Sequence, residues 1–302
     1  MLDNNQPGLV TVDVGRIIGT LWAGKWSVIA TTALFAIGSI IYTLSLPNTY
    51  SSSARLTQAD QANDGLSSLV RQYSGLASVA GFSLGGDDEQ IDYAIEVLQS
   101  RRFLQLLIDK YNILVPLMAS EGWDEQTGDL KIDKQLYDPG SNTWVRDVDL
   151  PFSPTPSLEE AHEVWQDTIE INRVGSFVSI TVQHYSPLLA KEWVETVVSE
   201  INAFVKQQEV EEAERSINYL LRELENTAVA ESKALLYDLI QRQTETIMLA
   251  NVRDEYVFKT IDPPTVPLEK TAPSRGLICT VITLVGCLVS CFYVLAIARL
   301  RG

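Results

Sequence analysis

The side chains that most often carry catalysis or bind metal ions are scarce in this sequence. It has two histidines, His162 and His184, and neither lies at metal-ligand spacing from a cysteine or a carboxylate. No H-E-x-x-H or C-x-x-C pattern is present. Acid–base pairs of carboxylates meet in space rather than along the chain, so sequence spacing identifies none. We therefore expect no catalytic, cofactor-binding or metal-binding residue, two structural histidines, and a protein that is not an enzyme.

The three cysteines, Cys279, Cys287 and Cys291, all lie in one apolar segment near the C-terminus. The rest of the chain therefore offers no thiol for a disulfide, and it must fold without one.

Two long runs without a charged residue bracket the chain, at residues 27–46 and 277–298. Each is long enough to cross a hydrocarbon core of about 30 Å as a helix. A buried core helix is the alternative, but soluble helices rarely extend this far without a charged face. The first run also lacks a signal-peptide cleavage site, so we expect it to be retained.

The flanking cations orient the two predicted spans. Arg16 and Lys25 precede the first span, and Arg299 and Arg301 follow the second. The positive-inside rule then places both termini in the cytoplasm and residues 47–275 outside it. That segment holds 19 of the 23 Lys and Arg and 37 of the 39 Asp and Glu, a formal charge of −18. It is therefore a poor candidate for binding nucleic acid or anionic lipid.

The outer segment mixes strand and helix signals. Alternation predicts strands at residues 49–58 and 176–184, the latter with Val178, Ile180 and Val182 on one face. A single helix is predicted over residues 89–111, and residues 121–156 read as loop with short strands. Ser157 and Glu160 form a capping box that opens another helix.

The stretch from residue 188 to residue 262 contains neither Gly nor Pro. Ser186 and Pro187 mark the start of a long helical region, residues 187–255, with a bend or a turn into a hairpin at Asn226 and Thr227. Alternation at Val257, Lys259 and Ile261 then predicts a strand. A lone helical arm buries too little surface to be stable, so we expect a homo-oligomer.

These signals together predict an α+β membrane protein in which two transmembrane helices flank an α/β base with a long extended helical arm. The predicted parts are a cytoplasmic segment 1–26, the spans 27–46 and 277–298, an outer domain 47–275 with a proline-rich connector 263–273, and a cytoplasmic tail 299–302.

Two features, one just before the second span and one inside it, suggest roles in packing. Prolines lack an N–H donor and bar a helix, so Pro264, Pro267 and Pro273 form a stiff connector into the membrane. An ordinary linker is the alternative. Gly286 and Ser290 are small residues four apart, a spacing that lets helices approach closely in lipid.

The connector followed by a span resembles the proline-rich signature of the Wzz chain length determinants, which are polysaccharide co-polymerases. Pro264, Pro267 and Pro273 match its P-x2-P-x4-S-P pattern, with Ala272 in place of serine, and Gly286 alone is kept from the glycine-rich sequence that follows. The resemblance also includes residues 46–50, 74–86, 94–104 and 247–262.

The resemblance implies a non-enzymatic co-polymerase of the bacterial inner membrane, whose main domain is periplasmic. Such a protein forms a ring-like homo-oligomer and regulates the chain length of O-antigen or a related surface polysaccharide. Its partners would be membrane lipid, an integral-membrane polymerase and the growing lipid-linked polysaccharide. The chain ends at Gly302 without a kinase domain, which favours the lipopolysaccharide type unless a separate kinase partner exists. The alternative is a capsule or exopolysaccharide export or adaptor component that bridges the periplasm.

Overall fold

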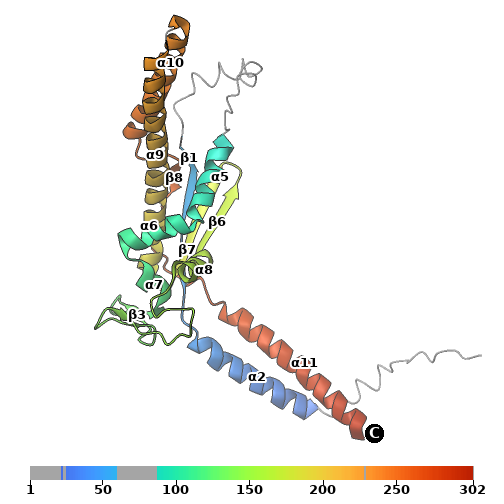
Figure 1. The fold of residues 1–302 in the computed structure, drawn as a ribbon. Helices are drawn as coiled ribbons and strands as arrows, with labels where there is room; N and C mark the ends of the chain where they lie inside the picture. Colours follow the sequence, from blue (N-terminus) through green and yellow to red (C-terminus); the bar gives the residue numbers. More distant parts are fainter. Residues whose placement is uncertain (1–21, 23–24, 60–86, 228, 302) are drawn as a thin grey trace, which may run out of the picture. The chain divides into compact units, whose positions relative to one another are not determined.

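The computed structural model describes residues 22, 25–59, 87–227 and 229–301 (Figure 1). The chain divides into two compact units. Unit 1 is Met1–Asn48 with Thr271–Gly302, and unit 2 is Thr49–Lys270. The predicted N-terminal segment, residues 1–26, lies almost entirely outside the described residues.

Among the described residues, unit 1 contains two apolar helices that pack against each other, α2 (Lys25–Ser45) and α11 (Arg275–Arg301). Both are long and apolar enough to cross a membrane, and they contain the predicted spans. The start of α11 is fastened to the chain that follows α2, because Arg275 Nη2 donates to Asn48 Oδ1 at 2.9 Å and to Leu46 O at 3.3 Å.

Unit 2 is built on a four-stranded antiparallel sheet with the order β6-β7-β1-β8. Its strands are β1 (Tyr50–Gln58), β6 (Ile169–Val174), β7 (Phe177–His184) and β8 (Phe258–Asp262). β1 buries alternate residues, among them Ala54 and Leu56, and β7 does the same. The predicted strands at 49–58 and 176–184 are therefore confirmed.

The two edge strands of the sheet differ in part from the sequence signals. The sequence did not predict β6, which begins at Ile169 directly after a helix and turns into β7 at Gly175, where φ is 62°. The strand predicted from Val257, Lys259 and Ile261 is confirmed as β8, although Val257 precedes its first residue, and Val257 and Phe258 are both buried while Lys259 and Ile261 are exposed. Backbone N–H groups of residues 256–258 bond to a side chain on a neighbouring helix, just before and at the start of β8.

In the part of unit 2 that the structure describes, four short helices complete the core: α5 (Asp87–Leu98), α6 (Arg101–Tyr111), α7 (Leu114–Met118) and α8 (Leu158–Thr168). The single helix predicted over residues 89–111 is wrong. The first helix ends at Leu98, and Ser100 caps the second, because its Oγ accepts a hydrogen bond from Phe103 N. The predicted capping box of Ser157 and Glu160 is confirmed at the start of α8.

The polar segment between α7 and α8 forms two small hairpins, as the sequence predicts. The first pairs β2 (Ser120–Trp123) with β3 (Leu130–Ile132), and the second pairs β4 (Tyr137–Asp138) with β5 (Thr143–Trp144).

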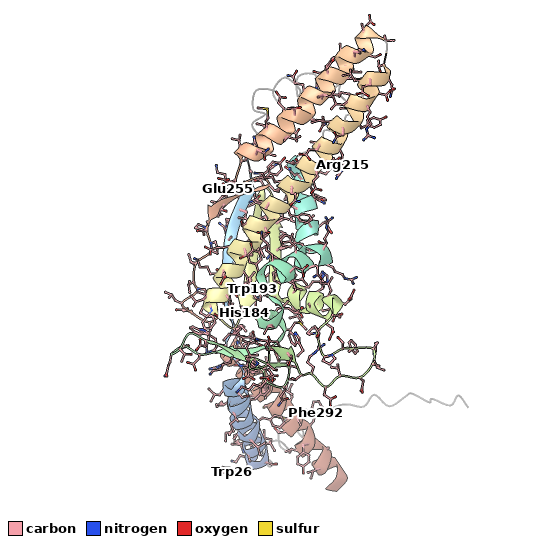
Figure 2. The ribbon with its side chains drawn as sticks, turned by 60° about the vertical axis from the view of Figure 1, so that its left-hand side comes forward. Trp26, His184, Trp193, Arg215, Glu255 and Phe292 are labelled. Carbon is pink, nitrogen blue, oxygen red and sulfur yellow. The ribbon has the colours of Figure 1, made fainter. Side chains whose placement is uncertain are left out.

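The long helical region is a hairpin of α9 (Pro187–Asn226) and α10 (Ala230–Val252), which lie side by side (Figures 1 and 2). Ser186 caps α9 by accepting a hydrogen bond from Leu189 N. The first half of α9 packs on the sheet through Trp193, Val194 and Ile201. The helix ends at Asn226, so of the two alternatives predicted at Asn226 and Thr227 the structure has the hairpin rather than the bend, and α9 alone is about 60 Å long.

Candidate functional site

The two apolar helices of unit 1 meet at Gly286. A Cβ atom built on Gly286 would lie 2.5 Å from Cγ and 2.6 Å from Cβ of Phe35 on α2. Real Cβ atoms keep more than 3.0 Å from such neighbours, so a side chain at this position must displace Phe35 or the helix. Gly286 therefore forms a notch in α11 that receives Phe35 of the same chain.

Small polar residues continue this interface along both helices. Ser39 and Thr43 of α2 and Ser290 of α11 are each at most 3% exposed. Their hydroxyls bond to carbonyls one helical turn back, as Ser290 Oγ does to Cys287 O at 2.8 Å. Thr43 Oγ1 also lies 3.4 Å from Cys279 Sγ. The structure thus brings Gly286 and Ser290 to the face of α11 that meets α2.

The proline connector begins as an extension of the sheet. β8 pairs with β1 as far as Asp262, and Pro263 and Pro264 then provide no N–H to continue the ladder. The buried Ser52 of β1 instead donates from Oγ to Thr265 O at 2.8 Å. Pro264 is buried, whereas Pro267 and Pro273 are half-buried. The first part of the connector is therefore fastened to β1.

A cavity of about 300 Å³ lies between α9 and this part of the connector. Its lining includes Glu195 of α9, Asp254, Glu255 and the two prolines 263 and 264. Glu255 Oε1 accepts a hydrogen bond from Thr260 N at 2.8 Å, which holds that carboxylate against β8. The cavity is acidic and has no cationic lining residue.

Asn202 joins α9 to the chain that returns from the hairpin. Its side chain is 5% exposed, and Oδ1 accepts from the backbone N–H groups of Tyr256, Val257 and Phe258 at 3.2, 2.8 and 2.9 Å. Its Nδ2 donates to Phe258 O at 3.0 Å. One side chain thus satisfies four backbone groups where the helical arm meets the sheet.

Sequence reasoning missed Asn202, although a signal was present. The residue falls four positions after Val198 and three before Val205, so it stands on the apolar stripe of α9. A lone amide in such a stripe needs buried partners. Ser52 on the buried face of β1 is a second case of the same signal.

Two further acidic residues of α9 make buried or partly buried contacts. Glu200 is 6% exposed, and its Oε1 accepts from Lys110 Nζ and Tyr111 Oη, both at 2.7 Å. Glu209 accepts from Gln90 Nε2 at 2.9 Å and from the Tyr256 hydroxyl. Burial and the neighbouring Glu209 raise the pKa of Tyr256. These carboxylates fasten α9 to its neighbours.

Both histidines contact backbone groups. His184 is buried, its Nδ1 accepts from Ser186 N at 3.0 Å, and its Nε2 donates to Pro116 O at 3.1 Å. Burial lowers its pKa, so the ring is held neutral. His162 Nε2 lies 2.7 Å from Gln99 O. Across the described residues, no group of three or more His, Cys, Asp or Glu side chains is placed to hold a metal ion.

One catalytic pattern does occur in the sequence, because Gly81-Phe82-Ser83-Leu84-Gly85 matches G-x-S-x-G. Such a serine acts as a nucleophile only on a strand-to-helix turn and beside a histidine base. These five residues lie outside the described ranges. His184 has both ring nitrogens committed to backbone atoms and so is not available as that base.

The outer half of the hairpin carries exposed apolar side chains. Tyr219, Leu235 and Tyr237 are 65%, 61% and 59% exposed, and beyond Val205 only Ala213 of α9 is buried. Figure 2 shows Arg215 on this part of α9, away from Trp193 and His184 at the other end. An isolated helical pair of this kind leaves much apolar surface in water.

Comparison with known proteins matches residues 10–111 to the family described as Wzz, chain length determinant protein. The match spans about one third of the chain. Over that segment it agrees with the resemblance seen in the sequence.

Individual proteins and solved structures also match this chain. The tyrosine-protein kinase wzc of Salmonella typhi is 31% identical over 124 residues, which are 39% of this chain and 16% of the kinase. The chain thus spans about one sixth of that relative's length. A full-length bacterial polysaccharide co-polymerase aligns with a TM-score of 0.38 and 11% identity over 97% of this chain and 98% of the other. A fragment of WzzB, the polysaccharide co-polymerase from Salmonella Typhimurium, gives 0.31 and 14% over 74% and 100%.

Proposed function

The chain is related through residues 10–111 to the Wzz chain length determinant family, and on this premise we propose that it is a non-enzymatic polysaccharide co-polymerase. It regulates the chain length of O-antigen or a related surface polysaccharide made by an integral-membrane polymerase. The observation that carries the proposal is the family match in the same chain as two apolar helices that bracket one α+β domain.

The proposed arrangement places α2 and α11 across the bacterial inner membrane, both termini in the cytoplasm and unit 2 in the periplasm. The cations that flank the two spans support this orientation. A periplasm-dependent reporter fused at Gly140, which is exposed in a turn, should be active, and the same reporter fused after Gly302 should be inactive. The reverse pattern would reject the orientation.

Assembly into a ring-like homo-oligomer is the second part of the proposal. The exposed apolar side chains on α9 and α10 gain a partner when a second hairpin packs beside the first. The proline connector and the Gly286 notch then act through packing rather than chemistry. The connector fixes how unit 2 leaves the membrane, and Gly286 with Ser290 sets the spacing of the helices.

The experiment that tests this function is deletion of the gene followed by electrophoresis of the surface polysaccharide. Loss of the modal length, with polymer still exported, supports a chain length determinant. Complementation with the intact chain must restore the original ladder. An unchanged ladder in the deletion strain would contradict the proposal.

A second candidate is an export or adaptor component of capsule or exopolysaccharide synthesis. The 31% identity with a segment of the tyrosine-protein kinase wzc favours it. The same deletion separates the two candidates, because an export component predicts loss of surface polymer rather than an altered length distribution.

A further inference from the structure

A groove of about 700 Å³ runs between α9 and α10 in the outer half of the helical hairpin. Figure 2 shows Arg215, one of its lining residues, on this part of α9. Binding sites for small molecules in proteins have volumes of about 300–1,000 Å³. The groove therefore has room for a small organic ligand or for a segment of a polymer.

Part of the lining is apolar and includes an open aromatic ring. Leu220 of α9 and Leu239 of α10 are half-buried. Tyr219, next to Leu220 in the chain, also lines the groove and is 65% exposed. The faces of an aromatic ring carry partial negative charge, so they attract C–H groups, which carry partial positive charge. This part of the groove suits a ligand surface that is rich in C–H groups.

The rest of the lining offers polar groups that the protein leaves without partners. Ser216 and Gln243 are half-buried, and Glu212 is exposed. Within the described part of the chain, the Ser216 hydroxyl, the Gln243 amide and the Glu212 carboxylate have no hydrogen-bond partner in the protein. Thr244 and Thr246 of α10 differ, because their hydroxyls donate to carbonyl oxygens one turn earlier at 2.8 and 3.2 Å. A hydroxyl, an amide and a carboxylate in the groove are thus available to a ligand.

The charges in the groove cancel. Glu212 and Arg215 carry opposite charges, and no other described lining residue is charged. Arg215 lies 3.8 Å from Glu211, and these side chains are 71% and 51% exposed. Such an exposed ion pair is weak, so the guanidinium remains available as a donor. The groove therefore favours an uncharged ligand over a cation or an anion.

We propose that this groove binds a neutral saccharide segment of the growing polysaccharide, with a pyranose ring against Tyr219. The inference deepens the proposed function and rests on it. A pyranose ring has C–H groups on its faces and hydroxyls around its edge, so it matches an aromatic ring flanked by donors and acceptors. Gln243 both donates and accepts, Glu212 accepts, and Arg215 donates. Hydroxyls, which also do both, pair with all three.

A second copy of the hairpin is the other candidate occupant. A protein surface in the groove would have to supply a partner for each of these polar groups, because a buried group without one is destabilising. Leu235 and Tyr237, which are exposed apolar side chains available for packing between copies, do not line the groove. The chemistry of the lining therefore fits a polyhydroxyl ligand better than a second hairpin.

The test measures binding by the full-length protein in detergent. The probe is the surface polysaccharide of the strain that carries the gene, freed from its lipid by mild acid and labelled at its reducing end with a fluorophore. Fluorescence anisotropy gives Kd. Tyr219→Ala should raise Kd about tenfold through loss of the ring contact, and Gln243→Ala should raise it several-fold.

Tyr237→Ala is the matched control. Tyr237 is 59% exposed on the same hairpin but lies outside the groove, so this variant should keep the wild-type Kd. Equal Kd values for Tyr219→Ala and Tyr237→Ala would overturn the proposal, as would a wild-type protein that does not bind the probe. A smaller oligomer for Tyr219→Ala by light scattering, with an unchanged Kd, would show that a second copy covers the groove and would also overturn it.

The polysaccharide ladder separates failure of this inference from failure of the proposed function. Tyr219→Ala combined with Gln243→Ala should shift the ladder as well as weaken binding. A ladder that depends on the gene but not on these two substitutions, with Kd unchanged, would reject the groove and leave the function intact. A ladder that is unchanged by deletion of the gene would reject the proposed function, and the Kd values would then decide the groove separately.

Discussion

Asn202→Ala should strongly destabilise unit 2, because one buried amide serves four backbone groups. The substitution removes the acceptor for three N–H groups and the donor for Phe258 O. Each orphaned buried group costs about 1–3 kcal/mol. With the lower end of that range for each of the four groups, the total loss is about 4 kcal/mol. For a chain of this size, such a loss lowers Tm by about 8–16 °C.

The assay is thermal unfolding of the full-length protein in detergent, with Asn218→Ala as the matched control. Asn218 lies on the same helix but is exposed, and its side chain has no such set of partners. Asn202→Leu keeps the branched shape of the side chain and removes the hydrogen bonds, so it should lose about as much stability as Asn202→Ala. Melting of Asn202→Leu at the temperature of Asn218→Ala would refute the hydrogen-bond explanation.

Three other predictions follow from the connector, the helix pair and the buried histidine. Gly286→Ala should weaken the α2–α11 packing by about 1–3 kcal/mol, and Phe35→Ala in the same chain should recover part of the loss. Thermal unfolding in detergent of both single variants and the double variant measures this coupling. Additive losses in the double variant would contradict the predicted contact. Replacing Pro264 and Pro267 together by alanine should alter the polysaccharide ladder while Tm stays near the wild-type value, and an unchanged ladder would reduce the connector to a linker. Because burial lowers the pKa of His184, the neutral ring contributes to stability above the unfolded pKa of about 6.5, and this contribution is lost as pH falls below that value. The fall in Tm from pH 7.5 to pH 5.5 should therefore be smaller for His184→Gln than for the wild-type protein. Equal falls in the two proteins would exclude His184 as a source of the pH dependence.

Local signals were sufficient where neighbours in the sequence determine the outcome. The capping box of Ser157 with Glu160 and the start of α9 at Pro187 depend on hydrogen bonds within one turn, and both were predicted. The alternation in β7 was predicted because one face of that strand is buried. The break between α5 and α6 was missed, because Ser100 caps a helix only when the chain turns there to pack Phe103 and Leu107 in the core.

Contacts between distant segments were beyond sequence reasoning. Gly286 and Ser290 were predicted to pack, yet nothing in their spacing names Phe35, more than two hundred residues away, as the side chain that fills the notch. The proline connector was recognised, but its attachment to Ser52 depends on the pairing of β1 with β8. Asn202 stood visibly on an apolar stripe, and only the return of the hairpin to residues 256–258 gives its amide partners.

By itself the sequence determined the two apolar helices, the acidic segment between them and the family resemblance, because hydropathy, charge and short motifs are properties of adjacent residues. Only the tertiary structure decided between a bend and a hairpin within residues 187–252, and only it showed that β8 joins β1. These outcomes depend on long-range pairing, whose free energy comes from partners that the local sequence does not contain.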